Sequence, residues 1–392
     1  MTRDTQVGII GAGPAGLFLA HLLQRAGIDC VVIEDRSRDY VEHRVRAGVL
    51  EQGTVDLMND TGVGERMRRE GLVHEGIQIA FDRQLHRIPL TDLTGRSISI
   101  YGQQEVVKDL IAARLARGGE ILFEVADVRL HGIDTVRPSI SFVHEGRDVT
   151  IRCDIIAGCD GFHGVSRSAI PTSALTIHER VYGFAWLGIL VQAPPSSDEL
   201  IYASHPNGFA LHSMRSSSVT RLYLQVAPDE QLEAWSDDRI WSELRTRLAT
   251  DGRIDLHEGP ILDRSIAEMR GFVTEPMQYG RLYLAGDAAH IVPATGAKGL
   301  NLAVSDVHAL SESLVEYFES GSTAGLDAYS NRCLRRVWRV QEFSWYMSSL
   351  LHNLPGNDEF GRRLQRAEIE WLVTSRAAAR SLAENYVGTP FS

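Results

Sequence analysis

The chain has 392 residues, of which 44% are hydrophobic and 23% are charged, and its formal net charge is −11. The length predicts two or three packed sub-structures, and the ordinary composition excludes a disordered chain. The acidic charge disfavours nucleic acid as a partner, because a phosphate-binding surface needs an excess of Lys and Arg. No apolar run is long enough to cross a bilayer and the first residues lead directly into a strand, so we expect a cytoplasmic protein without membrane contact.

The first predicted unit is a short apolar strand at residues 7–10, a glycine-rich turn and a helical run at residues 17–24. The turn has the GxGxxG spacing of dinucleotide-binding proteins. In that motif Gly11 permits the tight turn, Gly13 lets a diphosphate approach the backbone, and Gly16 lets the helix pack on the strand. The helix N-terminus then presents unpaired N–H groups to the anion.

A second strand is predicted at residues 29–34, and its last residue is Glu34. A carboxylate at this place accepts hydrogen bonds from an adenosine ribose. A lone GxGxxG also arises by chance, but the whole strand–turn–helix–strand unit predicts dinucleotide binding. It does not separate NAD from FAD.

Two later segments decide between these cofactors. Residues 153–161 form an apolar strand that runs into an Asp-Gly turn, and residues 281–290 form another that ends in Gly-Asp. Either alone is typical of a plain turn, whereas both behind a GxGxxG unit indicate FAD. Asp287 at the carboxyl end of its strand is placed to hold a ribityl hydroxyl. A helix predicted at residues 300–314 would direct its N-terminal dipole at the flavin pyrimidine edge.

The three motifs together, GAGPAG, GCDGFHG and LAGDAAHIVPATGAKGLN, resemble those of the group A flavoprotein aromatic hydroxylases. The resemblance runs from the first strand to residues 384–388. It implies an α/β fold with a Rossmann-like FAD-binding domain, a β-sheet-rich substrate domain and a C-terminal helical region. We expect their boundaries at residues 1–175, 176–276 and 277–392.

The resemblance also implies the chemistry. It is most specific to the members that use NADH or NADPH and O2 to hydroxylate 4-hydroxybenzoate to 3,4-dihydroxybenzoate. FAD is then the cofactor, a small aromatic acid is the substrate, and no metal is required. Residue by residue, the family assigns to FAD the positions Gly11, Gly13, Gly16, Glu34, Arg46, Gln103, Asp160, Asp287, Gly299, Leu300 and Asn301. It assigns to the nicotinamide cofactor Asp35, Arg36, Tyr40, Arg44, His163 and Arg270.

A substrate pocket can be predicted from strand alternation. Ser213 and Arg215 share one face of a predicted strand, and the next strand places Tyr223 on the face opposite its two leucines. A guanidinium and two hydroxyls suit a carboxylate. On pattern alone an ordinary polar surface strand is slightly favoured, and the resemblance reverses that choice, because the matching family positions hold the substrate carboxylate.

The family places two tyrosines at the substrate phenol, and they match Tyr202 and Tyr386. By this resemblance Tyr202 accepts the phenol proton, Tyr386 relays it, and His74 passes it to solvent with a pKa near neutrality. Family members have two consecutive prolines in the third motif, whereas here Pro293 is followed by Ala294. The carbonyl that faces the phenol remains, but the proline restraint on φ is lost.

The nicotinamide preference is predicted from Asp35, which follows Glu34 where NADPH-selective members carry an arginine. A carboxylate there repels a 2′-phosphate unless Arg36 or Arg38 compensates, so we expect NADH to be used at least as well as NADPH. A solvated charged segment without influence on specificity is the alternative.

The C-terminal region is rich in large apolar residues: Trp338, Phe343, Trp345, Tyr346, Met347 and Leu350. Packing within the chain and packing on a second subunit are equally compatible with this pattern, and the family's dimers favour a homodimer. The four cysteines, Cys30, Cys153, Cys159 and Cys333, lack zinc-type spacing, and we expect structural thiols.

Other functions remain open at this stage. They include hydroxylation of another phenolic or amino-substituted benzoate, an FAD reductase that never activates O2, and a flavin-binding sensor. Neither of the last two functions needs the predicted carboxylate-binding residues, Ser213, Arg215 and Tyr223, or the two tyrosines predicted at the phenol.

Overall fold

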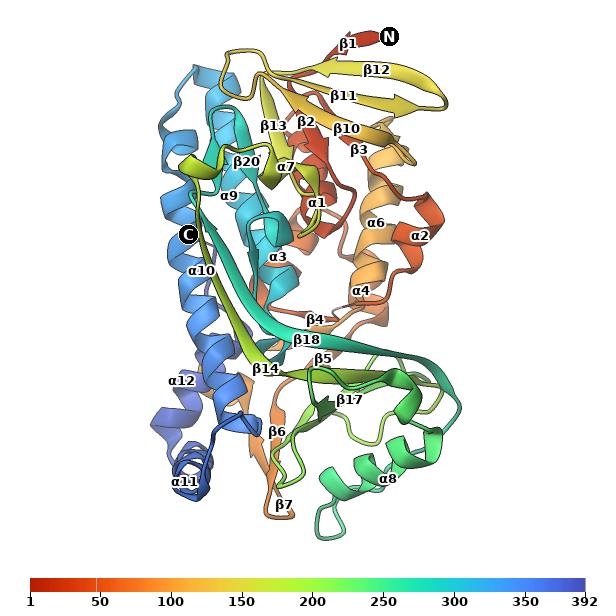
Figure 1. Ribbon diagram of the computed structural model, residues 1–392, viewed down its shortest axis with the longest axis vertical. Helices are drawn as coiled ribbons and strands as arrows, with labels where there is room; N and C mark the ends of the chain where they lie inside the picture. The colour runs from red at the N-terminus through yellow and green to blue at the C-terminus, as the bar shows by residue number, and fades with distance from the viewer. Residues whose placement is uncertain (47, 392) are drawn as a thin grey trace.

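The computed structural model describes residues 1–46 and 48–391, which form two halves stacked along the long axis (Figure 1). Two long antiparallel strands, β14 (Thr176–Val191) and β18 (Ile261–Glu275), run from one half into the other. Helix α10 (Ala324–Leu351) runs along the side of both halves. The mixed α/β class predicted from the sequence is confirmed.

The upper half is built on a six-stranded sheet in the order β19-β20-β13-β2-β3-β9. Its inner strands are parallel and fully buried: β20 (Leu282–Leu284), β13 (Ile155–Gly158), β2 (Val7–Ile10) and β3 (Cys30–Ile33). Continuous apolar runs of this kind are typical of parallel strands that are covered on both faces. The edge strands are β19 (Gln278–Tyr279) and β9 (Ile121–Leu122).

Helix α1 (Pro14–Arg25) packs on one face of this sheet, between α6 (Gln103–Ala116) and α9 (Gly299–Ser320). The opposite face is covered by a second sheet of four strands. In sheet order these are β1 (Thr2–Asp4), β12 (Arg147–Arg152), β11 (Ser139–His144) and β10 (Ala126–His131). Contact between the sheets is so close that a methyl group on Gly8 would lie 2.6 Å from Ile140 Cδ1.

The lower half contains an eight-stranded sheet in the order β21-β18-β14-β17-β16-β15-β6-β7. Besides the two long strands, its members are β21 (His290–Ile291), β17 (Thr220–Val226), β16 (Ala210–Met214), β15 (Ile201–Ala203), β6 (Ile77–Phe81) and β7 (Gln84–Ile88). Helix α8 (Asp237–Arg247) contributes Ile240, Trp241 and Leu244 to the core beside this sheet.

This sheet also takes in two strands from before residue 175, where the first predicted domain ends. Strands β6 and β7 come from residues 77–88, and β6 pairs in parallel with β15. The sequence shows no local signal for this crossing, because the pairing joins segments more than a hundred residues apart.

Between the halves lies a small sheet of β4 (Val49–Leu50), β8 (Ile98–Ile100) and β5 (Leu72–His74). The remaining short helices are α2 (Arg38–His43), α3 (Gln52–Asp60), α4 (Glu65–Glu70), α5 (Leu90–Thr94) and α7 (Val165–Ser168). Residues 299–387 form four long helices, in which α11 (Glu359–Thr374) and α12 (Arg376–Val387) follow α9 and α10. None of the described helices is long and apolar enough to cross a membrane.

The apolar residues of α10 divide between core and surface. Phe343, Met347 and Leu350 are buried within the chain, whereas Trp338 is 42% and Trp345 40% exposed. Tyr346 is half-buried and donates to Glu368 on α11. All four cysteines are free and buried, as expected of structural thiols.

Candidate active site

The turn at residues 11–16 shows why each glycine is needed. Gly11 has φ +104°, and a side chain there would overlap the carbonyl of Cys159. A side chain at Gly16 would overlap the carbonyl of Gly11, so helix α1 packs on the turn only without one. A methyl group on Gly13, by contrast, would meet no described atom within 4 Å. The chain itself therefore explains two glycines, and the third leaves open space at a helix N-terminus, where a diphosphate fits.

Glu34 follows strand β3 and is bound to the same turn. Its carboxylate accepts hydrogen bonds from the backbone N–H groups of Ala12, at 2.7 Å, and Arg36, at 3.0 Å. Burial raises the pKa of Glu34 from 4.5 to about 7. A carboxylate held at this strand end suits the ribose contact predicted for it.

Asp160 and Asp287 lie at the ends of neighbouring strands β13 and β20. One oxygen of Asp160 accepts from Ser166 N at 2.8 Å, while its Oδ1 is buried without a partner among the described residues. Burial raises the pKa of Asp160. An unpaired buried oxygen beside the glycine turn indicates a missing donor, and Asp287 is exposed beside it with room for a ligand hydroxyl.

The turn that carries Asp287 is supported by a buried pair that the sequence did not reveal. Asp306 accepts a hydrogen bond from Gly286 N at 3.0 Å and pairs with His290 Nε2 at 2.6 Å. Burial opposes the charge on His290, but Asp306 outweighs it and raises the pKa of His290. No local sequence motif indicates this pair, because its two residues lie 16 positions apart.

Helix α9 begins at Gly299, one residue before its predicted start, and no described side chain caps its first turn. The Asn301 side chain is committed elsewhere: its oxygen accepts from Glu51 N and Thr54 Oγ1, each at 2.9 Å, and its amide donates to Val49 O at 3.0 Å. Backbone N–H groups of Gly299 and Leu300 thus remain for a cofactor, and they lie at the positive end of the helix dipole.

The three residues predicted to bind a substrate carboxylate lie together. Arg215 Nη1 lies 3.1 Å from Ser213 Oγ, and Arg215 Nη2 lies 3.3 Å from Tyr223 Oη. Burial lowers the pKa of Arg215, its Nε has no partner, and no described carboxylate forms an ion pair with it. A desolvated guanidinium without a counter-ion is a strong candidate for binding an anion.

A loop that sequence reasoning did not connect with this trio lies against it. Arg215 Nη2 lies 3.4 Å from the carbonyl of Arg46, and a methyl group on Gly48 would be 3.1 Å from Arg215 Nη1. The glycine lets this loop pass directly over the guanidinium.

The two predicted phenols are also adjacent. Tyr202 Oη and Tyr386 Oη lie 2.6 Å apart, and both side chains are buried. Burial raises the pKa of both hydroxyls. His74 differs from the prediction: it is 1% exposed, and neither ring nitrogen has a partner among the described residues. Burial lowers the pKa of His74 to about 4, so the expected near-neutral pKa is wrong.

Pro293 and Ala294 open a short 3-10 turn, Ala294–Gly296, that leads to α9. Pro293 is buried, whereas Ala294 is exposed. The turn is held from outside by a 2.9 Å hydrogen bond between Thr295 Oγ1 and Ser348 Oγ of α10. This contact restrains the loop where the family's second proline is absent.

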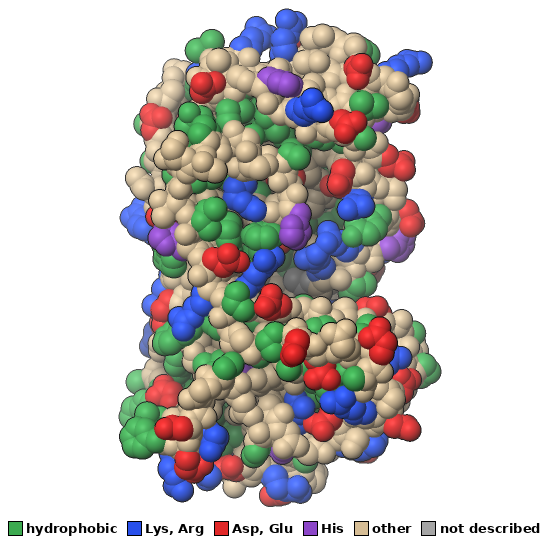
Figure 2. Space-filling model, in the orientation of Figure 1, with side chains coloured by type: hydrophobic (Ala, Val, Ile, Leu, Met, Phe, Trp, Pro, Cys, Tyr) green, Lys and Arg blue, Asp and Glu red, His purple; other side chains and the backbone are tan. Residues whose placement is uncertain are grey.

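The predicted nicotinamide residues form two separate groups. Arg36 and Arg44 lie over the Tyr40 ring at 5.5 and 5.6 Å, and Asp35 pairs with Arg36 at 3.6 Å. In the second group the Arg270 guanidinium stacks 3.9 Å from the centroid of the Phe162 ring, which His163 meets edge-on. Figure 2 shows a hollow between the upper and lower halves with Lys and Arg side chains on its rim.

Comparison with known proteins shows the family to which the chain belongs. A family model described as FAD binding domain matches residues 4–344. The chain is 48% identical over 391 residues to p-hydroxybenzoate hydroxylase of Acinetobacter baylyi, covering 100% of this chain and 96% of that protein. It is 25% identical to 3-amino-4-hydroxybenzoate 2-monooxygenase of Streptomyces cremeus, over 79% of this chain and 78% of that one.

Solved structures show the same fold. The structure of p-nitrophenol 4-monooxygenase from Pseudomonas putida superposes with a TM-score of 0.83 and covers 97% of both chains at 19% identity. A complex of aklavinone-11 hydroxylase with FAD and aklavinone gives a TM-score of 0.74 at 22% identity, over 89% of this chain and 69% of that one.

Proposed function

Because the chain belongs to the group A FAD-dependent aromatic hydroxylases, we propose that it hydroxylates 4-hydroxybenzoate to 3,4-dihydroxybenzoate with NAD(P)H and O2. The observation that supports this substrate is that two groups of polar side chains lie on the same face of the sheet. Arg215 with Ser213 and Tyr223 is suited to a carboxylate, and Tyr202 with Tyr386 is suited to a phenol. A para-hydroxy acid has these two functions at its opposite ends.

Arg215 binds and orients the substrate in this proposal. Its guanidinium already contacts two hydroxyls and the Arg46 carbonyl, which hold it in place. An incoming carboxylate therefore meets a planar set of N–H donors with a fixed orientation. Anchoring the carboxylate directs the opposite end of the ring at Tyr202.

Tyr202 then accepts the hydrogen bond of the substrate phenol and donates its own to Tyr386. Because burial raises the pKa of both tyrosines, neither holds a negative charge, and the pair moves a proton without storing one. Removing the phenol proton pushes electron density onto the ring carbon ortho to it. His74 stays the proposed exit, and both of its ring nitrogens are without a partner among the described residues.

FAD would pass the electrons of NAD(P)H to O2 and activate the oxygen, and the protein supplies binding, orientation and exclusion of water. Residues proposed to hold it are Gly11, Gly13, Gly16, Glu34, Arg46, Gln103, Asp160, Asp287, Gly299, Leu300 and Asn301, the last through its backbone. The open space at Gly13 and the unpaired Asp160 oxygen support this assignment.

Two further properties belong to the same proposal. NADH is used at least as well as NADPH, because Asp35 follows the ribose-binding Glu34 and is only partly neutralised by the exposed Arg36. The protein is a homodimer, supported by exposed apolar side chains on the C-terminal helices: Trp338, Trp345, Phe360, Leu364 and Trp371. We place it in the cytoplasm, where thiols stay reduced and its four cysteines are free.

Hydroxylation of a related benzoate is the second candidate. Ala294 in place of a proline, together with the relative that acts on 3-amino-4-hydroxybenzoate, favours testing it. A reductase that leaves O2 untouched would need neither Arg215 nor the tyrosine pair.

The test is O2 uptake by the purified yellow protein with each nicotinamide, with and without 4-hydroxybenzoate, followed by identification of the product. We expect uptake to depend on the benzoate and to match 3,4-dihydroxybenzoate formed. Parallel assays with 4-aminobenzoate separate the second candidate. Nicotinamide oxidation without any hydroxylated product would reject the proposal.

A further inference from the structure

The segment that carries Tyr386 is held by three cations. Lys298 Nζ donates to the carbonyls of Asn385, at 2.6 Å, and Tyr386, at 2.8 Å. Arg96 Nη1 donates to Gly388 O at 3.2 Å. Arg336 donates to the carbonyls of Thr389, at 2.9 Å, and Pro390, at 3.1 Å. Five carbonyls at and just beyond the end of α12 thus each accept from a positive side chain, and we call these three residues the cationic clasp.

The clasp is favourable because a helix C-terminus carries partial negative charge. Glu51 joins two of its members: Oε1 accepts from Lys298 at 2.8 Å and Oε2 from Arg336 at 3.4 Å. Gly388 has φ +81°, and a side chain there would overlap the Glu51 carboxylate. The backbone after α12 therefore packs directly on the group that connects the clasp.

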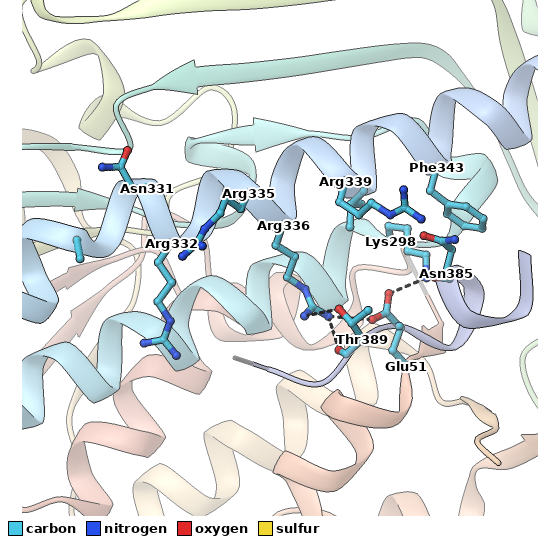
Figure 3. Close-up of a pocket in the computed structure, with 13 residues that line it drawn as sticks. Glu51, Lys298, Asn331, Arg332, Arg335, Arg336, Arg339, Phe343, Asn385 and Thr389 are labelled. Atoms are coloured by element: carbon cyan, nitrogen blue, oxygen red, sulfur yellow. Dashed lines mark hydrogen bonds and ion pairs between the residues drawn. The ribbon is translucent and has the colours of Figure 1, made fainter. Parts of the chain in front are cut away.

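Arg336 approaches this segment from the side of α10, next to a pocket of about 620 Å³ (Figure 3). Its side chain is 15% exposed, and it also donates to Thr389 Oγ1 at 3.2 Å. Neighbouring Arg335 lines the same pocket and is exposed, and no hydrogen bond or ion pair is recorded for it within residues 1–46 and 48–391. The two arginines differ in contacts although they are adjacent on one helix.

We propose that Arg336 is a positioning residue for Tyr386, an inference that rests on the proposed function. Tyr386 lies in the last turn of α12, and its hydroxyl reaches Tyr202 only while that turn stays in place. A displacement of about 1 Å would take the 2.6 Å bond beyond hydrogen-bonding length. Arg336 holds the residues that follow the turn, so it fixes the proton path without touching substrate.

The test measures ionisation of the bound phenol in holoenzyme by its ultraviolet absorbance across pH. Arg336→Met keeps an unbranched apolar stem and removes the guanidinium donors. We expect the apparent pKa of the bound phenol to rise, on the order of one pH unit, and product per nicotinamide oxidised to fall several-fold. KM for 4-hydroxybenzoate should change little, because the Arg215 group is untouched. Arg336→Lys should recover part of both effects.

Arg335→Met is the matched control and should behave as wild type. Should Arg336→Met fold poorly, Arg336→Gln serves the same comparison. A wild-type phenol pKa and product ratio in the Arg336 variant overturns the positioning role. Wild-type protein that neither ionises nor hydroxylates the bound substrate overturns the proposed function, and the positioning role with it.

Discussion

Tyr202 on strand β15 and Tyr386 on helix α12 share a 2.6 Å hydrogen bond although 184 residues separate them in the chain. Their rings meet edge-on, at an interplanar angle of 87°. The bond joins the eight-stranded sheet to the C-terminal helices, so the proposed proton path requires β15 and α12 to be correctly docked.

Tyr202→Phe should separate ring activation from the use of O2. The variant keeps Arg215, Ser213 and Tyr223, which are proposed to bind the substrate carboxylate, so 4-hydroxybenzoate should still stimulate NAD(P)H oxidation. The substrate phenol loses its hydrogen-bond acceptor, so H2O2 should replace most of the hydroxylated product. Product formed per nicotinamide oxidised is the measurement. Tight coupling in this variant would contradict the role of Tyr202.

Arg215→Ala should abolish productive substrate binding while FAD stays bound. Loss of a buried charged partner costs on the order of 3 kcal/mol, or roughly a 100-fold weaker Kd. Binding is followed by the change in flavin fluorescence on titration with 4-hydroxybenzoate. Arg245→Ala is the control, because Arg245 is exposed on α8, pairs with Glu258 and should matter far less. Equal affinities in the two variants would reject the assignment.

Affinity for FAD should depend on pH through Glu34. Burial raises its pKa to about 7, so much of the carboxyl is protonated at neutral pH in the protein without FAD. Ribose hydroxyls donate to the ionised form, so binding should lower the pKa and FAD affinity should strengthen as pH rises from about 6 to 8. Titration of apoprotein with FAD measures this slope. Glu34→Gln should flatten it, and an equal slope in wild type and variant argues against Glu34.

Asp35→Arg should shift the nicotinamide preference towards NADPH. The substitution removes a carboxylate next to Glu34, which we propose to bind the ribose, and adds a cation for the 2′-phosphate. Steady-state kcat/KM for NADH and NADPH gives the ratio in wild type and variant. A strong NADPH preference in the wild type defeats the prediction before the variant is made.

Much of this site follows from local rules that a sequence displays. The glycine turn was predictable because each of its roles depends on residues a few positions apart. Alternation placed Ser213 and Arg215 on one face of a strand and Tyr223 on the next strand. In the structure Arg215 lies 3.1 Å from Ser213 Oγ and 3.3 Å from Tyr223 Oη. The tyrosine pair came from family resemblance alone.

The missed features all depend on distant pairing. Lys298 and Glu51 form a buried ion pair across 247 positions, and no local pattern in the sequence indicates that they meet. Nothing near His74 in the chain indicates that its ring is buried, which is why its pKa was misjudged. Long-range ion pairs and the burial that shifts a pKa are set by tertiary packing, which the periodicity of the sequence does not encode.

The interleaving of the two sheets has a consequence for how the chain reaches its native state. Strand β6 can pair with β15 only after β15 has been synthesised. The parallel sheet of the upper half stays incomplete until β20, which follows residue 281, has been synthesised. Pairings of such high sequence separation carry a large loop-closure cost and slow folding. During synthesis neither half can complete its sheet early. We therefore expect the edge of β13 that pairs with β20 to stay exposed until most of the chain has left the ribosome. Fragments cut at residue 175 should therefore aggregate rather than fold.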